Sequence, residues 1–382
     1  MSRTTKQMIL VGGGHAHMTV MLRLDEYLSR GHQVTLINRS PFHYYSGMGP
    51  GMFSGIYRPE EIRFHVRKMV EDRGGEFIEG EVVRVHPQAN KLILASGDEV
   101  GYDVASFNTG SYVPLTSLEG VTEEILTVKP ILNLLRAKQR VLNQLSQGIP
   151  RLVVVGGGAA GLEITGNLER LVRKQNGTAQ ITLLAGRRFL PAFPEKVRRL
   201  ALSSFVKRKI SVMEGARVRT FEKGEAVLED ERRFPFDLAI LALGVRPSPL
   251  FADSGLAVGP DGGLLVNNFL QSTDYPELFG GGDCISLAGH PLDKVGVFAV
   301  RQNPVLHHNL MAALEGGEMQ PFVPQKNYLL IFNLGDGRGI FYKGRRIFAG
   351  RTAFFLKDWI DRKFVKSFQV SGEQNRSLQR DL

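Results

Sequence analysis

The stretch Gln7–Asn38, QMILVGGGHAHMTVMLRLDEYLSRGHQVTLIN, contains the pattern that decides the fold. An apolar run is followed by three glycines, and a helical segment then leads to a second apolar run. This order predicts a strand, a tight turn, a helix and a strand. At Gly12 and Gly14 the backbone must approach a dinucleotide pyrophosphate closely, and the N-terminus of the helix favours the negative charge.

Three polar residues of this stretch carry separate predictions. Asn38 ends the second strand about 20 residues after the glycines, where a contact with a ribose hydroxyl is expected. His17 replaces the third glycine of the usual G-x-G-x-x-G, so we expect the helix to lie slightly further from its strand. His15 and His17 do not share a helix face, which argues against a metal pair. We therefore expect no metal site, and we place His15 among the cofactor-binding residues.

The opening pattern returns in the middle of the chain. A second apolar strand runs into Gly156-Gly157-Gly158-Ala159-Ala160-Gly161, a complete G-x-G-x-x-G, and a helix and a strand follow. Two such units are far more specific than one. The sequence therefore predicts an α/β fold with two Rossmann-like, doubly wound dinucleotide-binding domains and a small C-terminal α+β region. Gly156, Gly158 and Gly161 are expected to bind the second dinucleotide.

The end of the second strand in this second unit reads Ala185-Gly186-Arg187-Arg188. An acid at this place binds the free ribose hydroxyl of NAD, whereas arginine accommodates the 2′-phosphate of NADP. Arg187 therefore favours NADPH, or a loose selectivity between the two nicotinamide cofactors. The alternative is that both arginines are solvated surface residues.

Composition excludes several classes of function. The chain has 382 residues, a formal net charge of +10 and one cysteine, which excludes internal disulfides and a redox-active cysteine pair. The positive charge favours anionic partners, but no nucleic-acid motif or aromatic-interleaved basic patch is found, so we expect no nucleic acid partner. The N-terminus shows no signal region, and no apolar stretch is long enough to span a bilayer. These features predict a cytoplasmic protein, or one that is peripheral on the inner face of a membrane.

Further motifs complete a resemblance to a known family. Phe107-Asn108-Thr109-Gly110, Gly244-Val245-Arg246-Pro247 and Gly282-Asp283 each follow a predicted strand. Together with the two glycine fingerprints, their spacing resembles the two-dinucleotide flavoprotein reductases over roughly residues 7 to 315. The resemblance implies FAD on the first unit and NAD(P)H on the second. It also implies that Asp283 binds the ribityl hydroxyls, with Thr109, Gly110 and Gly282 beside the cofactor.

The presence of a single cysteine excludes the branches of this superfamily that use cysteine pairs. Disulfide reductases and sulfide:quinone reductases use cysteine pairs, which a single Cys284 cannot supply. The chain otherwise resembles type II NADH dehydrogenases and the flavoprotein module fused to selenide, water dikinase, whose marks include Tyr45-Ser46-Gly47-Met48. The resemblance implies that hydride passes from nicotinamide to flavin and that electrons then leave to a quinone. A selenium-linked or other soluble-acceptor flavin reductase, and a non-catalytic FAD-binding redox-responsive protein, are the alternatives.

The same resemblance suggests residues at the reacting end of the site. Glu163 matches a glutamate that lies near the nicotinamide and flavin of type II dehydrogenases; the alternative is a first-turn acid that the helix dipole stabilises. The segment Asp293–Gln302 corresponds to the one that lines the quinone pocket of these relatives. Lys294 and Gln302 are expected to hydrogen-bond a quinone carbonyl, and Phe298 to stack on the ring.

We divide the chain into four parts on the basis of these motifs. Residues 1–113 are the first part of an FAD-binding domain, 114–255 an NAD(P)-binding domain, 256–318 the second part of the FAD-binding domain, and 319–382 a C-terminal region.

The C-terminal region is predicted to contain a small sheet and an amphipathic helix from Thr352 to about Phe368. Leu356, Ile360, Phe364 and Phe368 recur every four residues, and basic residues outnumber acidic ones through the tail. This composition is typical of a helix that lies on an anionic membrane. The alternatives are a helix that covers the flavin face of the sheet and a contact in a homodimer.

Overall fold

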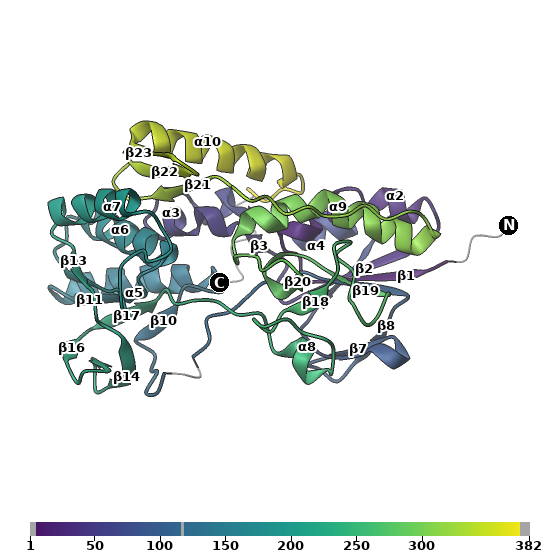
Figure 1. Cartoon of the computed structure of the whole chain (residues 1–382), viewed down its shortest axis with the longest axis horizontal. Coiled ribbons are helices and arrows are strands. Elements are labelled where there is room, and N and C mark those ends of the chain that lie inside the picture. Colours follow the sequence, from purple (N-terminus) through teal and green to yellow (C-terminus); the bar gives the residue numbers. More distant parts are fainter. Residues whose placement is uncertain (1–4, 116–117, 375–382) are drawn as a thin grey trace.

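The structure is a computed structural model that describes residues 5–115 and 118–374. Two parallel five-stranded sheets, which lie side by side along the long axis, form its framework (Figure 1). The first sheet has the strand order β19-β9-β1-β2-β5, and the second has the order β10-β17-β11-β12-β13. The predicted α/β fold with two doubly wound units is confirmed.

The first sheet places three predicted motifs at one edge. Its strands are β1 (Gln7–Val11), β2 (Gln33–Asn38), β5 (Glu76–Glu79), β9 (Val104–Phe107) and β19 (Leu278–Gly280). The helices of this unit include η1 (His15–His17), α1 (Met18–Leu22), α2 (Leu24–Leu28), α4 (Val66–Glu71) and α9 (Gly296–Glu315). All five strands are parallel, so the motifs that follow β1, β9 and β19 meet at the carboxyl edge. The strand order reverses between β1 and β9, which is where ligands bind in such sheets.

The second sheet repeats this arrangement. Its strands are β10 (Ile125–Thr127), β11 (Arg151–Val155), β12 (Gln180–Leu184), β13 (Ser211–Met213) and β17 (Leu238–Leu241). The helices of this unit are α5 (Asn133–Gln147), α6 (Ala159–Lys174) and α7 (Glu195–Lys207). A small antiparallel sheet contributes to the apolar core around β11 and β17, and consists of β14 (Val218–Glu222), β15 (Glu225–Leu228) and β16 (Arg233–Pro235). Phe221 and Phe236 meet edge to face at 5.6 Å in this core.

Short elements complete the first unit, except that one of them, α3 (Gly49–Phe53), packs on α5 and α6 of the second unit. They are β3 (His43–Tyr44), η2 (Ser46–Met48), α3 (Gly49–Phe53), η3 (Pro59–Glu61), β4 (Arg63–Phe64), β6 (Val82–His86), η4 (Pro87–Ala89), β7 (Lys91–Leu94), β8 (Glu99–Gly101), α8 (Leu250–Asp253), β18 (Leu264–Val266), η5 (Gly282–Cys284) and β20 (Ile285–Leu287). Ser254 Oγ, directly after α8, accepts a hydrogen bond of 2.9 Å from the Val85 amide in β6. The chain has therefore returned from the second unit to the first by the end of α8. The predicted domain divisions at residues 113, 255 and 318 stay predictions.

The C-terminal region bridges the two units. It contains β21 (Leu330–Asn333), β22 (Gly339–Lys343), β23 (Arg346–Gly350) and α10 (Arg351–Phe368), and α10 lies along its sheet (Figure 1). The far end of the helix contacts the first unit, where the Phe364 and Phe368 rings lie 6.2 and 6.5 Å from that of Phe64. The periodic apolar arc predicted for a membrane is therefore partly buried inside the protein.

No helix within residues 5–115 and 118–374 has the length and apolar character needed to cross a bilayer.

Candidate functional site

The first glycine turn is packed against the end of β9. Gly12 has φ +89°, and a Cβ there would lie 2.4 Å from the Asn108 carbonyl oxygen. A Cβ on Gly14 would lie 2.3 Å from Asn108 Oδ1. Asn38 Oδ1 accepts a hydrogen bond of 2.9 Å from the Gly13 amide, so Asn38 supports the turn directly. Its predicted contact with a ribose stays a prediction, and this supporting bond is a role that the sequence did not suggest.

Buried polar atoms without partners gather around this turn. Among the described residues, His15 Nε2, Asn108 Nδ2 and Gln302 Nε2 are buried and make no hydrogen bond. Gln302 Oε1 accepts a hydrogen bond of 2.7 Å from the Gly282 amide, which places that side chain at the same edge. A buried polar group left unsatisfied costs about 1–3 kcal/mol. The pyrophosphate and ribityl chain of FAD are rich in hydrogen-bonding oxygens, so these residues fit FAD.

Asp283 lies at the centre of this edge. Its Oδ2 accepts hydrogen bonds of 2.7 Å from Ser111 Oγ and 2.7 Å from Lys129 Nζ. Burial alone would raise the pKa of Asp283, but the Lys129 ammonium and the Ser111 hydroxyl hold it below its ordinary value. The carboxylate is therefore charged and fixed. Neither Ser111 nor Lys129 belongs to a recognisable motif, so sequence reasoning did not find them.

Thr109, Gly110 and Cys284 flank Asp283. Thr109 is exposed after β9, and Gly110 takes a left-handed conformation with φ +72°. Cys284 is buried and donates from Sγ to the Phe107 carbonyl at 3.4 Å, and burial raises the pKa of its thiol. A protonated thiol in such a place is a packing group.

Both histidines after the glycines are buried. His17 bonds through Nδ1 to the Gly12 carbonyl at 2.7 Å and through Nε2 to Ser106 Oγ at 2.8 Å. His15 Nδ1 lies 3.3 Å from His43 Nε2. Burial lowers the pKa of both His15 and His17 to about 4, so both are neutral at pH 7. No cluster of three or more metal-binding side chains occurs in the described part of the chain.

A polar cluster joins α6, α10 and the segment after β3. We call Glu163, Lys357, Asp361 and Tyr45 the α10 polar cluster. Lys357 Nζ donates to Asp361 Oδ2 at 2.7 Å and to the Gly47 carbonyl at 2.8 Å, and Tyr45 OH donates to Asp361 Oδ1 at 3.0 Å. Burial raises the pKa of Glu163, although the nearby Lys357 charge opposes this.

Sequence reasoning found Glu163 and missed Lys357 and Asp361. Glu163 Oε1 accepts a hydrogen bond of 2.8 Å from the Asn333 amide in β21. Because α6 begins at Ala159 and has no acidic residue in its first turn, Glu163 is not the first-turn acid of the alternative. The available signal for Lys357 and Asp361 was their spacing of four residues, on the helix side that also carries the buried Ala353 and Val365.

The predicted acceptor residues lie at the start of α9. Lys294 Nζ pairs with Asp261 Oδ2 at 2.7 Å and donates to the Ile285 carbonyl at 2.6 Å. Phe298 is buried and its ring meets that of Tyr328 edge to face at 5.3 Å. Lys294 is thus already paired, and its contact with an acceptor stays a prediction, as do those of Gln302 and Phe298.

The second glycine turn resembles the first at its first glycine and differs from it at Gly158. Gly156 has φ +128°, and a Cβ there would lie 2.2 Å from the Ala242 carbonyl oxygen. A Cβ on Gly161 would lie 1.8 Å from the Gly156 carbonyl oxygen, whereas one on Gly158 would meet nothing within 4 Å. Gly156 and Gly161 are therefore required by packing, and Gly158 faces open space where a dinucleotide can approach.

The two arginines after β12 differ in their surroundings. Arg188 pairs with Glu195 at 2.7 Å, whereas Arg187 is exposed and its guanidinium has no partner in the part of the chain that the structure describes. Only Arg187 is free to meet a phosphate without losing an ion pair.

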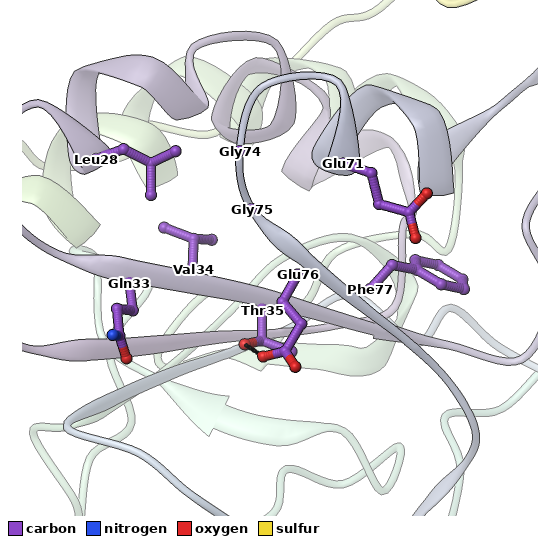
Figure 2. Close-up of a pocket in the computed structure, with 9 residues that line it drawn as sticks. All are labelled: Leu28, Gln33, Val34, Thr35, Glu71, Gly74, Gly75, Glu76 and Phe77. Atoms are coloured by element: carbon purple, nitrogen blue, oxygen red, sulfur yellow. Dashed lines mark hydrogen bonds between the residues drawn. The ribbon is translucent and has the colours of Figure 1, made fainter.

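A separate surface pocket has a volume of about 450 Å³ (Figure 2). Its lining includes Thr35 and Glu76, which are joined by a hydrogen bond of 3.0 Å, and Gln33, the first residue of β2. These residues lie at the amino ends of β2 and β5. Because cofactors bind at the carboxyl ends of such strands, this pocket is not part of the candidate site.

Comparisons with known proteins identify the family of the chain. The family model for pyridine nucleotide-disulphide oxidoreductases matches residues 6–312. The type II NADH:quinone oxidoreductase of Staphylococcus saprophyticus is 23% identical over 398 residues, which covers 97% of this chain and 98% of that protein.

Two solved structures have similar folds. The sulfide:quinone oxidoreductase of Aquifex aeolicus has a TM-score of 0.79 at 19% identity, covering 98% of this chain and 94% of that one. NDH2 of Plasmodium falciparum has a TM-score of 0.77 at 15% identity, covering 96% of this chain and 100% of that one. At these identities the likeness bears on the fold alone.

Proposed function

Because the chain belongs to the pyridine nucleotide-disulphide oxidoreductase family, we propose that it is an FAD-dependent NAD(P)H:quinone oxidoreductase. The relative from Staphylococcus saprophyticus is named for this reaction. The observation that carries the proposal is the group of unpaired buried polar atoms on His15, Asn108 and Gln302 beside the first glycine turn. When bound, FAD supplies the redox chemistry, since it takes hydride from nicotinamide and releases electrons to an acceptor.

The first unit binds and orients FAD. Gly12 and Gly14 leave room for the pyrophosphate, and the unpaired Asn108 amide donates to its oxygens. Gln302 holds the Gly282 amide and offers its own Nε2. Asp283 accepts hydrogen bonds from the ribityl hydroxyls, because a charged carboxylate is a strong acceptor.

The second unit binds the nicotinamide dinucleotide at Gly156, Gly158 and Gly161. Arg187 selects NADPH, or accepts both cofactors, because the place after β12 carries no acid to bind a free ribose hydroxyl.

The electron acceptor is not a thiol pair of this chain. One cysteine is present and it is buried, so the disulfide exchange for which the family is named has no residues here. We place the acceptor instead at the α10 polar cluster. In this proposal the Lys357 ammonium donates to a carbonyl oxygen of the acceptor, and Glu163, whose pKa burial raises, supplies that oxygen with a proton.

The exposed face of α10 docks to a membrane in this proposal. Phe355 is 71% exposed and Trp359 54%, and Phe348 on β23 adds a third exposed ring at 43%. Lys363 Nζ lies 5.3 Å from the Trp359 ring and Lys366 is exposed, so apolar and basic groups share this face. Such a combination binds anionic lipid surfaces. The protein would then be peripheral on a membrane, where a lipid-soluble quinone is within reach.

Stopped-flow mixing with NADPH and with NADH tests the proposal. We expect either cofactor to bleach the flavin absorbance, with NADPH at least as effective, and a quinone to restore it. Arg187→Ala should lower kcat/KM for NADPH by about tenfold, the loss of one charge-assisted contact. Arg188→Ala is the matched control, because its guanidinium already pairs with Glu195.

Three outcomes would contradict parts of this proposal. A flavin that neither nicotinamide reduces would indicate a non-catalytic flavoprotein. Reduction followed by oxidation with soluble acceptors but not quinones would indicate a soluble-acceptor reductase. A clear preference of the wild type for NADH would make Arg187 a solvated surface residue.

A further inference from the structure

Lys129 belongs to the second unit, and it contacts Asp283 of the first unit, the residue that we assign to FAD binding. It follows shortly after β10 of the second sheet, yet its Nζ lies 2.7 Å from Asp283 Oδ2 and 2.7 Å from Ser111 Oγ in the first unit. The Lys129 carbonyl accepts hydrogen bonds from the Thr127 hydroxyl at 2.6 Å and from Asn133 Nδ2 at 3.4 Å. The residue is therefore held through its backbone and through its ammonium group.

The ion pair between Lys129 and Asp283 engages only one of the two carboxylate oxygens of Asp283. The side chains of Lys129 and Asp283 are 24% and 14% exposed, so salt screens the pair less than a surface pair. Lys129 and Ser111 both bind Oδ2 of the carboxylate, whereas Oδ1 makes no hydrogen bond within the described residues. One oxygen is thus fixed and the other is free for an incoming hydroxyl.

The charge of Lys129 affects the pKa of His15 and of His43 as well as that of Asp283. Burial is the main cause that lowers the pKa of His15 to about 4, and the Lys129 charge adds to it. The pKa of His43 is lowered well below its ordinary value by burial, by His15 and by Lys129. The Lys129 field therefore extends from Asp283 to the rings that follow the first glycine turn.

We propose that Lys129 is a flavin-positioning residue that the nicotinamide-binding unit supplies. It holds Asp283 with Oδ1 free for the ribityl chain, and it places a positive charge beside the flavin that raises its reduction potential. The reduced flavin carries more negative charge than the oxidised one, so a nearby cation favours reduction. The inference rests on the proposed function in that FAD is the cofactor.

Substitutions at Lys129 test this without turnover. Lys129→Met removes the charge, Lys129→Gln removes it but keeps a hydrogen-bond donor, and Lys129→Arg keeps both. We expect the neutral variants to bind FAD about tenfold more weakly and the midpoint potential to fall by about 30 mV, the equivalent of a tenfold change in a two-electron equilibrium. The arginine variant should lie close to the wild type.

Lys91→Met is the matched control. Lys91 pairs with Glu99 at 2.6 Å, but both side chains are about half exposed, at 48% and 53%, in the β6-β7-β8 sheet. It should change neither the FAD affinity, measured by flavin fluorescence, nor the potential, measured by dye-coupled reduction.

The outcomes separate this inference from the proposed function. If Lys129→Met loses FAD, the midpoint potential is measured on Lys129→Gln in excess FAD. If both neutral variants lose FAD and Lys129→Arg retains it, the positioning role is supported. Neutral variants with wild-type FAD affinity and potential would overturn it, and a lowered Tm alone would mean that Lys129 only joins the units. Failure of the proposed function is different, because the wild type would then hold no FAD or hold FAD that nicotinamides do not reduce.

Discussion

At the scale of single residues, the first glycine turn leaves no room for side chains. The two atoms nearest to a Cβ on Gly14, Oδ1 and Cγ of Asn108, belong to the same asparagine whose Nδ2 is buried and unpaired. A side chain at Gly14 would therefore displace a group that we assign to FAD binding.

We expect Gly14→Val to yield largely colourless protein. The added Cβ would lie 2.3 Å from Asn108 Oδ1 and 2.9 Å from its backbone oxygen, so Asn108 must move. The measurement is the ratio of flavin to protein absorbance after purification. Gly158→Ala is the control, because a Cβ there meets nothing within 4 Å, and it should keep its FAD. A yellow Gly14→Val protein with normal flavin content would defeat the assignment of this turn.

His17 makes stability depend on pH. Burial lowers the pKa of His17 to about 4, below its unfolded value of 6.5, although the bond to Gly12 opposes the shift. Between these values the unfolded chain binds the proton more strongly, so stability is complete above pH 6.5 and is lost as the pH falls toward 4. The loss from this one group is about 2 kcal/mol at pH 5.

His17→Gln should be less stable than the wild type at pH 7 and show a smaller further loss between pH 7 and 5. The measurement is urea unfolding of the FAD-loaded proteins at both values. His86→Gln, at an exposed position on β6, should keep the wild-type dependence. An equal pH dependence in His17→Gln and the wild type would mean that other groups titrate in this window.

At the scale of elements, α10 has two faces with different partners. The Phe364 ring stacks on His15 at 5.7 Å, and Asp361 and Lys357 lie on the same buried side. Phe355 and Trp359 point to solvent. Deletion of the whole helix would therefore remove core contacts of the flavin-binding unit, so point substitutions are the appropriate test of each face.

Lys357→Met should destabilise the protein by about 3–5 kcal/mol, because it leaves the buried Asp361 charge unpaired. Lys357→Met with Asp361→Leu should recover much of the Tm, since a buried pair is often replaceable by apolar residues. Turnover with quinone should stay low in the double variant, while NADPH still bleaches its flavin. Recovery of quinone turnover together with Tm would show that the pair serves stability alone.

At the scale of the whole molecule, the two units face each other through their carboxyl edges, and the C-terminal region spans both. Glu163 of the second unit bonds to β21, and α10 packs on β4 of the first unit. The exposed rings of α10 and β23 therefore lie on the region that spans both units. Such an arrangement suits an enzyme that meets its acceptor at a membrane.

Phe355→Ser with Trp359→Ser should reduce co-sedimentation with anionic liposomes and turnover with a long-chain quinone, because two exposed rings no longer enter the interface. Turnover with a water-soluble quinone should be unchanged. Val206→Ser is the control, since Val206 is 73% exposed on α7 and belongs to neither α10 nor β23. Unchanged liposome binding in the double variant would defeat membrane docking, and a change in oligomeric state would indicate a homodimer contact.

The local sequence pattern was sufficient to predict the two doubly wound units and their glycine turns. Each strand, turn and helix of these units is encoded by consecutive residues. Where two backbone segments approach closely, only glycine fits, so its position in the sequence marks the turn. Gly12 and Gly156 pack on the next strand's carbonyl in the same way, which is why both fingerprints could be read. The fold class and two dinucleotide sites followed from these stretches, and the resemblance to the flavoprotein reductases implied FAD and NAD(P)H as the cofactors.

Tertiary structure alone decided which polar groups share the site. Lys129 meets Asp283 across 154 positions of sequence, and Glu163 meets Asn333 across 170. Side chains this far apart carry no periodic signal, because their contact depends on how two sheets face each other. For the same reason the apolar period of α10 predicted a helix but not its partners: the packing against Phe64 and His15 determines which of its rings are buried.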